Sequence, residues 1–212
     1  MPRDGSDTRA RLLREAARLL AGRGTHQVTN REIIEAAGQK NTSALSYHFG
    51  DRGDLLAAIL SEAGPALDEQ RGRIGGALDH RSSTSRIVEA LLVPYAGCLL
   101  NEAGRHYVQI VDQLRGQFDG SHSVAGVEEP HLRRLLGLID ARPSSASAPV
   151  RRERMIAMVT LMTAVVAERA RTIEANGAPT LDHMAFVDNL NAMLVGIIEA
   201  PALHLAVDTA AS

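Results

Sequence analysis

The chain has 212 residues, of which 45% are hydrophobic, and its formal net charge is −2. This length and balance predict one or two compact globular domains, and the near-neutral charge excludes a polycation that binds nucleic acid over its whole surface. A single cysteine, Cys98, excludes an internal disulfide and a cysteine-based zinc site. No run of eighteen apolar residues and no hydrophobic N-terminal segment is present, so we expect a cytoplasmic protein that neither spans a membrane nor carries a secretion signal.

The spacing of apolar residues between residues 8 and 65 predicts four consecutive helices. Residues 8–20 carry one apolar stripe, and a capping box at Thr29-Asn30-Arg31-Glu32 starts a short helix that ends at Ala37 before Gly38. A third short helix fits residues 42–49. A fourth contains Leu55 and Leu60, and Gly64-Pro65 should kink or end it.

The rest of the chain is also helical in its periodicity. We expect helices over residues 84–100, 105–118, 130–140, 150–175 and 180–199, with a loop at 119–129 and a linker at 142–147. No segment has the alternation of a strand. The predicted fold is all-α, with an N-terminal three-helix helix-turn-helix domain over residues 1–58 and a larger helical domain over residues 59–212.

The three short helices of the first fifty residues have the pattern of a helix-turn-helix. Apolar Ile33, Ala37, Leu45 and Phe49 are placed to pack the second helix against the third. The polar groups left on and before the third helix suit base edges and phosphates, and they include the only lysine of the chain: Lys40, Asn41, Thr42, Ser43, Ser46, Tyr47 and His48.

The run TNREIIEAAGQKNTSALSYHFGDRGDLL, residues 29–56, resembles the DNA-binding region of the tetracycline-repressor (TetR/AcrR) family of bacterial regulators. The matching features are the Thr-capped second helix, Ala36-Ala37-Gly38 at the turn, Leu45 with His48-Phe49, and Asp51-Arg52 before the fourth helix. The chain departs from the pattern in a turn one residue longer and in Ser46 where the family has tyrosine, with Tyr47 one place later. Either Tyr47 or Ser46 takes that tyrosine's phosphate contact.

The resemblance implies a homodimeric transcriptional regulator released from operator DNA by a small molecule, most simply a repressor; an activator on the same frame is the alternative. It adds Thr29 and Arg31 to the DNA-contacting residues named above. It also implies an effector pocket beyond residue 60, with an apolar ligand that moves the fourth helix. Candidate lining residues, each of which is equally suited to an ordinary core, are Tyr95, Cys98, His106, Tyr107, Met155, Met158 and Met162.

The last two predicted helices are apolar on nearly every face, whereas a surface helix shows a single stripe. Pairing them with their symmetry mates in a four-helix interface would bury the excess. The residues predicted for this dimer interface are Met158, Leu161, Met162, Val165, Val187, Leu190, Leu194 and Ile197.

Two other classes of function are weaker. An enzyme is disfavoured because the sequence holds no HExxH, P-loop, GxGxxG or GxSxG motif, and we expect no cofactor and no metal. The best metal-like cluster, Glu128, Glu129 and His131, reads as a solvated loop. A helical interaction module that does not bind DNA would explain the apolar C-terminal helices but not the first fifty residues.

Overall fold

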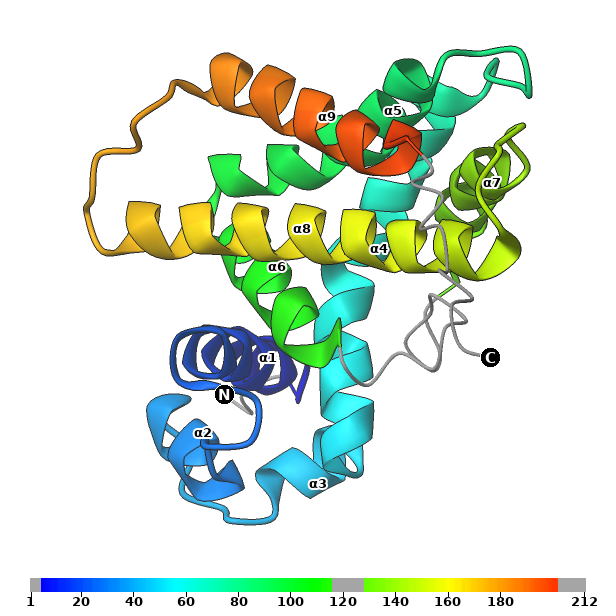
Figure 1. The fold of residues 1–212 in the computed structure, drawn as a ribbon. Helices are drawn as coiled ribbons and strands as arrows, with labels where there is room; N and C mark the ends of the chain where they lie inside the picture. The colour runs from blue at the N-terminus through cyan, green and yellow to red at the C-terminus, as the bar shows by residue number, and fades with distance from the viewer. Residues whose placement is uncertain (1–4, 116–127, 202–212) are drawn as a thin grey trace, which may run out of the picture.

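The structure is a computed structural model that describes residues 5–115 and 128–201, and all regular elements in these ranges are helical (Figure 1). This confirms the all-α prediction. The elements are α1 (Gly5–Arg23), α2 (Asn30–Ala36), α3 (Ala44–Phe49), α4 (Arg52–Gly75), α5 (Thr84–Gly97), the 3-10 turn η1 (Cys98–Leu100), α6 (Glu102–Leu114), α7 (Pro130–Asp140), α8 (Ala148–Glu174) and α9 (His183–Glu199).

Helices α1 to α3 form a small head at one end of the molecule, and α4 rises from it into a larger helical body (Figure 1). Leu12, Leu20, Ile33, Leu45 and Leu55 form the centre of the head and are almost fully buried. The division we propose at residues 58 and 59 lies within α4, which therefore joins head and body as one continuous rod.

Helix α4 does not end at Gly64-Pro65 but runs on to Gly75. A proline inside a helix removes one backbone hydrogen bond and usually favours a break. Here the turns beyond it are held by packing, because Leu67, Asp68 and Arg71 are all buried against the body. Tertiary contacts therefore override the local signal for termination.

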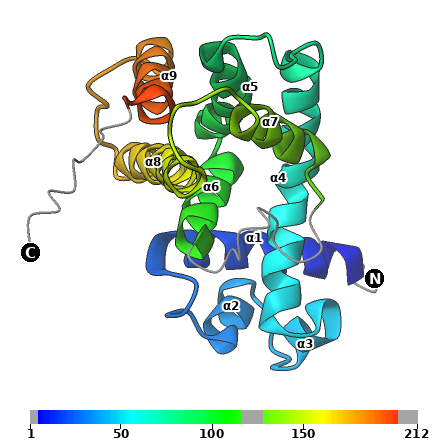
Figure 2. The same cartoon turned by 45° about the vertical axis from the view of Figure 1, so that its right-hand side comes forward.

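The body consists of α5 to α9 around the upper half of α4. Helices α8 and α9 lie side by side and run in opposite directions, and α6 packs against both α8 and α1 (Figures 1 and 2). The single helix predicted over residues 84–100 is an α-helix to Gly97 followed by a 3-10 turn. Asn101 then caps α6, which begins three residues earlier than predicted because the Asn101 side chain accepts from the Gly104 amide.

Most of the predicted loop at 119–129 lies outside the described residues. In the two described ranges, no helix is both long enough and apolar enough to cross a bilayer.

Candidate DNA-binding interface and effector-binding region

Helix α2 begins with the predicted capping box. The Thr29 hydroxyl accepts from the Glu32 amide at 3.3 Å, while the Glu32 carboxylate accepts from the Thr29 amide at 2.8 Å. The Thr29 hydroxyl also donates to this carboxylate, and Arg23 pairs with it at 2.7 Å. These donors, the Thr29 amide foremost, lower the pKa of Glu32 to about 2. Thr29, a predicted DNA contact, therefore has a structural role in fixing α2.

The low pKa of Glu32 predicts an acid-sensitive head. A carboxylate whose pKa is lower in the folded chain stabilises the fold fully above its unfolded pKa, here 4.5, and loses that effect as the pH falls towards about 2. We therefore expect Glu32→Gln to flatten the fall in unfolding midpoint between pH 4.5 and pH 2. Thermal unfolding across this range checks it, with Glu62→Gln on the exposed face of α4 as the control; parallel curves for wild type and Glu32→Gln would contradict it.

Helix α3 is shorter than predicted and begins at Ala44 rather than at residue 42. The Asn41 side chain accepts from the Ser43 amide at 3.0 Å, which closes a local turn that competes with helix formation. Thr42 and Ser43 therefore belong to the turn that leads into α3. On the inner face of α3, Leu45 and Phe49 are buried against the head.

The outer face of α3 and its leading turn is polar and open. The side chains exposed there are Lys40, Asn41, Thr42, Ser43, Ser46 and Tyr47, with His48 partly covered. Tyr47 is 84% exposed and its ring meets that of His48 edge-on, with centroids 5.0 Å apart. The Ser46 hydroxyl donates a hydrogen bond to the Ser43 carbonyl at 3.1 Å. In the described part of the chain, no such hydrogen bond ties the Tyr47 side chain to the backbone. A ring this exposed contributes little to folding and is free to contact a partner.

Arg31, at the start of α2, is exposed on the same head. Its Nε donates to Glu35 at 2.7 Å, and this hydrogen bond raises the pKa of the Arg31 guanidinium. An exposed pair of this kind contributes little to stability, so phosphate can displace Glu35.

Two side chains to which the sequence assigned no role hold the α1–α2 corner, one from within the head and one from the body. From α4, Arg52 donates to the carbonyls of Thr25 at 2.8 Å and Val28 at 3.0 Å. From α6, the Gln113 side chain accepts from the Thr25 amide at 2.7 Å and donates to the carbonyls of Leu20 and Ala21. The α1–α2 corner is thus held by both α4 and α6. No spacing signal in the sequence marks such a long-range polar contact.

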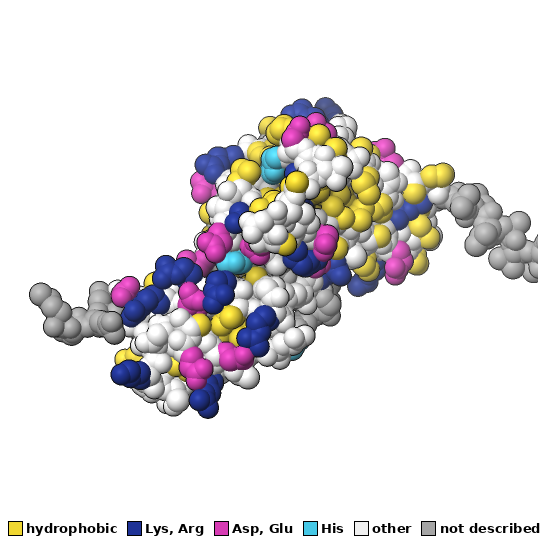
Figure 3. Space-filling model, turned by 90° about the vertical axis from the view of Figure 1, so that its left-hand side faces the viewer, with side chains coloured by type: hydrophobic (Ala, Val, Ile, Leu, Met, Phe, Trp, Pro, Cys, Tyr) yellow, Lys and Arg dark blue, Asp and Glu magenta, His cyan; other side chains and the backbone are white. Residues whose placement is uncertain are grey.

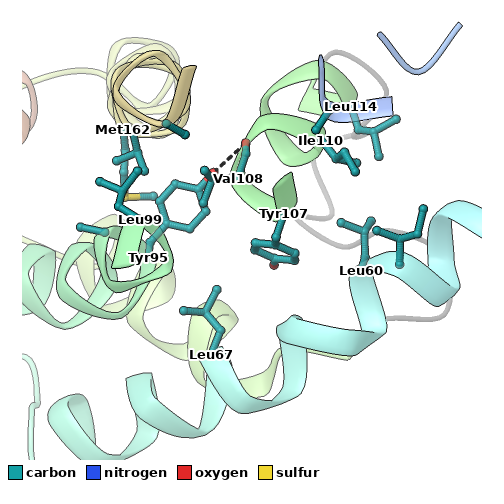
Figure 4. Packing of buried hydrophobic residues seen from close by; sticks show 14 of the residues in the cluster. Leu60, Leu67, Tyr95, Leu99, Tyr107, Val108, Ile110, Leu114 and Met162 are labelled. Atoms are coloured by element: carbon teal, nitrogen blue, oxygen red, sulfur yellow. Dashed lines mark hydrogen bonds between the residues drawn. The ribbon is translucent and has the colours of Figure 1, made fainter. Parts of the chain in front are cut away.

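Of the residues predicted for the effector pocket, Tyr95, Tyr107 and Met162 lie in the interior of the body between α5, α6 and α8. His106 and Met155 lie apart from each other, because His106 is beside Glu174 at the end of α8 and Met155 is near the start of the same helix. Figure 4 shows Tyr95, Leu99 and Met162 packed together, with the Tyr95 hydroxyl on the Val108 carbonyl at 3.5 Å. Burial raises the pKa of the Cys98 thiol to about 11 and lowers that of His106, so both are neutral near pH 7. Buried along with Tyr95 are Tyr107, Met155, Met158 and Met162.

The loop read as a solvated metal-like cluster is in fact part of a buried polar contact. Arg71 of α4 pairs with Glu129 at 2.7 Å, and both side chains are largely buried. Asp68, one turn earlier, accepts from the amides of His131 and Leu132 and so caps the start of α7. Glu129 is therefore tied to α4. Within residues 5–115 and 128–201, no group of three His, Cys, Asp or Glu side chains is arranged to hold a metal.

Helices α8 and α9 carry exposed apolar side chains, and Figure 3 shows hydrophobic side chains gathered on the upper body toward its right-hand side. Five of the eight residues predicted for a dimer interface instead face the core of their own chain: Met158, Met162, Val187, Leu190 and Leu194. The other three, Leu161, Val165 and Ile197, are partly exposed. The exposed large apolar side chains of the pair are Val150, Ile156, Met184 and Met193, at 41%, 49%, 67% and 46%. In both helices the more apolar stripe therefore packs against the core of the same chain.

Comparison with known proteins agrees with this architecture. Residues 12–59 match the sequence profile of the "bacterial regulatory proteins, tetR family". No curated protein sequence matches significantly. Among solved structures, the fatty acid degradation regulator FadR of Bacillus halodurans is 17% identical, with a TM-score of 0.55 over 88% of this chain and 97% of its own.

Two further structures have the same fold. The probable transcriptional regulatory protein RHA5900 is 18% identical, with a TM-score of 0.58 over 91% of this chain and all of its own. NalD of Pseudomonas aeruginosa, described as the secondary repressor of a multidrug efflux pump, is 17% identical, with a TM-score of 0.54 over 89% of this chain and 96% of its own.

A helix-turn-helix head with an open polar face, carried on an all-helical body, defines a DNA-binding transcriptional regulator. Residues 12–59 are therefore similar to the DNA-binding segment of the TetR family of bacterial regulatory proteins, and the whole chain shares the fold of the solved regulators.

Proposed function

We propose that the protein is a non-enzymatic, cytoplasmic homodimeric repressor that binds a near-palindromic operator and is released by a small-molecule effector. The observation that carries the proposal is the open face of α3, where Tyr47 and its polar neighbours are exposed while Leu45 and Phe49 fix the helix from within. A helix presented in this way fits the major groove, and a two-fold pair of such heads reads two half-sites.

Lys40, Tyr47 and His48 are proposed to contact phosphates, and Thr42 or Ser43 to read base edges. The exposure of these side chains supports this division of roles. Ser46 keeps its hydroxyl on the Ser43 carbonyl, which favours Tyr47 over Ser46 for the phosphate contact of the family tyrosine.

The proposed dimer pairs α8 and α9 with their copies through the outward face that carries Ile156, Met184 and Met193. Ala192 and Gly196 are exposed on the same α9. Small residues of this kind let helices approach closely, and apolar burial supplies the driving force.

The proposed effector enters the interior of the body beside Tyr107 and Met162. The lining there is mainly aliphatic and sulfur-containing, which favours an apolar ligand. Displacement of α6 by a ligand would be passed to the head through Gln113, because that side chain holds the α1–α2 corner. When two sites are coupled in this way, binding at one changes the binding free energy at the other by roughly 1–3 kcal/mol.

Removing a proposed phosphate contact should weaken binding to all sequences alike. We expect Lys40→Ala to lower operator and non-operator affinity and to reduce the salt slope by about one, because one fewer counterion is released. His48→Ala should also weaken binding on every sequence. Fluorescence anisotropy at several salt concentrations checks this. Arg73→Ala, on the exposed face of α4 in the body, is the control; unchanged affinity and slope in both variants would rule out these roles.

The direction of regulation is tested with a reporter gene placed behind an operator obtained by selecting genomic fragments that bind the protein. A repressor lowers expression until its effector is added, whereas an activator raises it. Expression that rises with the amount of protein would overturn the repressor assignment and leave the DNA-binding role intact.

A further inference from the structure

A hollow lies outside both regions described above and is lined by residues from α5, α7, α8 and α9. The end of α7, the start of α8, the end of α9 and the first turn of α5 can be located in Figures 1 and 2. The volume of the hollow is about 360 Å³, within the range that holds a small molecule. The cleft is distant in the fold from α3 and, apart from Met155, shares no residue with the proposed effector pocket.

The cleft is rich in arginine. Arg142, Arg151 and Arg154 line it, and none of the three is within ion-pairing distance of a carboxylate in the described part of the chain. Each donates hydrogen bonds to backbone carbonyls instead. Arg142 donates to the carbonyl of Ser82, Arg151 donates to that of Ala146, and Arg154 donates to those of Ile198 and Pro201. The guanidinium groups are therefore fixed in place while their charge stays unneutralised. Such preordered cations are suited to a carboxylate or phosphate.

Two polar groups in the wall of the cleft are buried without a partner. The hydroxyl of Thr84 is covered from solvent and makes no hydrogen bond, and the Thr84 residue is 1% exposed. The Nε of Arg151 is likewise covered and unpaired. Buried polar groups normally find a partner, because leaving one unpaired costs free energy. Both residues line the cleft, but these two atoms are covered and do not face it, so the groups open to a ligand are the terminal nitrogens of the arginines.

The remaining wall is partly apolar and partly acidic. Ile139, Met155 and Ile198 give it hydrophobic surface, whereas Asp140 and Glu199 are exposed carboxylates. Three cations against two carboxylates leave the cleft net positive, and Arg151 stands in the first turn of α8, where the helix dipole adds positive potential. A ligand with one anionic group and a short apolar body fits this combination.

We propose that this cleft is a binding site for a small organic acid, separate from the interior effector pocket. Its anionic group pairs with Arg151 and Arg154, while its apolar part packs on Met155. An occupant would join α5, α7, α8 and α9, and so would stiffen the helices proposed to form the dimer. The proposal does not depend on DNA binding or on the repressor assignment.

Benzoate is a suitable probe, with the uncharged benzamide as its matched analogue. In the full chain labelled at its methionine methyl groups, we expect benzoate up to about 20 mM to shift the NMR signal of Met155, and to bind at least tenfold more tightly than benzamide by calorimetry. Signals of Met158 and Met162, which report on the interior, should stay in place. Shifts confined to Met158 and Met162, equal binding of benzamide, or no binding at all would overturn the proposal.

Variants separate a binding role from a structural one. Arg151→Gln should weaken benzoate binding about tenfold, and Arg154→Gln should weaken it about threefold, since each removes a cation from the cleft. Arg152→Gln, on the exposed side of the same helix turn, is the control and should bind as wild type does. Unchanged benzoate affinity in both cleft variants would contradict the assignment.

Discussion

Replacing Ile156 and Met193 together with glutamate is expected to convert the protein into a folded monomer whose operator affinity is at least about a hundredfold lower. Both side chains are about half exposed on the outer face of α8 and α9, so a charge there does not disturb the core of the chain. Across the proposed interface, however, four carboxylates would be buried without partners. Two heads held together also bind two half-sites far more tightly than one head binds either.

Sedimentation and circular dichroism check this expectation. Leu190→Glu on the same α9 is the informative contrast, because Leu190 is 1% exposed and a buried unpaired charge costs about 4 kcal/mol or more. That variant should unfold, whereas the Ile156/Met193 variant should keep its helical signal. A folded dimer from the Ile156/Met193 variant would show that the copies meet elsewhere.

Gln113→Leu is expected to loosen the head while leaving the body intact. The substitution removes three hydrogen bonds at once, at 2.7 to 3.1 Å, and leaves the Thr25 amide and the carbonyls of Leu20 and Ala21 without this partner. We expect a loss of about 2 kcal/mol in unfolding free energy and about a tenfold loss in operator affinity, because a loosened head must be ordered on binding.

Hydrogen exchange locates the effect. Exchange of the Thr25 amide should accelerate at least about tenfold, since it loses its acceptor, while amides of α8 and α9 keep their protection. Gln70→Leu, at an exposed position of α4, should change neither exchange nor affinity. Equal acceleration throughout the chain would mean that Gln113 contributes only general stability and does not couple α6 to the head.

Local signals predicted the elements of the head well. The Thr29–Glu32 capping box and the apolar positions of α2 and α3 depend on neighbours within a few residues, so the sequence alone indicates them. The start of α3 was misplaced by two residues because the Asn41 turn competes with the helix there. Gly64-Pro65 indicates a kink or an end of the helix, and the sequence does not show that Leu67 and Arg71 are buried beyond it and hold the helix to Gly75.

Contacts between distant segments were not predictable in this way. Glu129 looked like a solvated residue, yet it pairs with Arg71, which is 58 positions away. The apolar character of α8 and α9 was recognised, but which stripe faces the core depends on how α5 and α6 pack beneath them. Gln113 carries no motif at all, and its role follows only from the place of α6 beside α1.

Binding of the purified protein to genomic fragments, with selection and sequencing at two salt concentrations, tests the DNA-reading role most directly. We predict a palindromic consensus whose half-sites are spaced by about one or two helical turns and which persists at the higher salt. Binding that is strongly salt-dependent and yields no consensus would contradict the proposal that α3 reads sequence. Absence of binding, repeated on protein unfolded and refolded to strip any ligand, would contradict DNA binding itself.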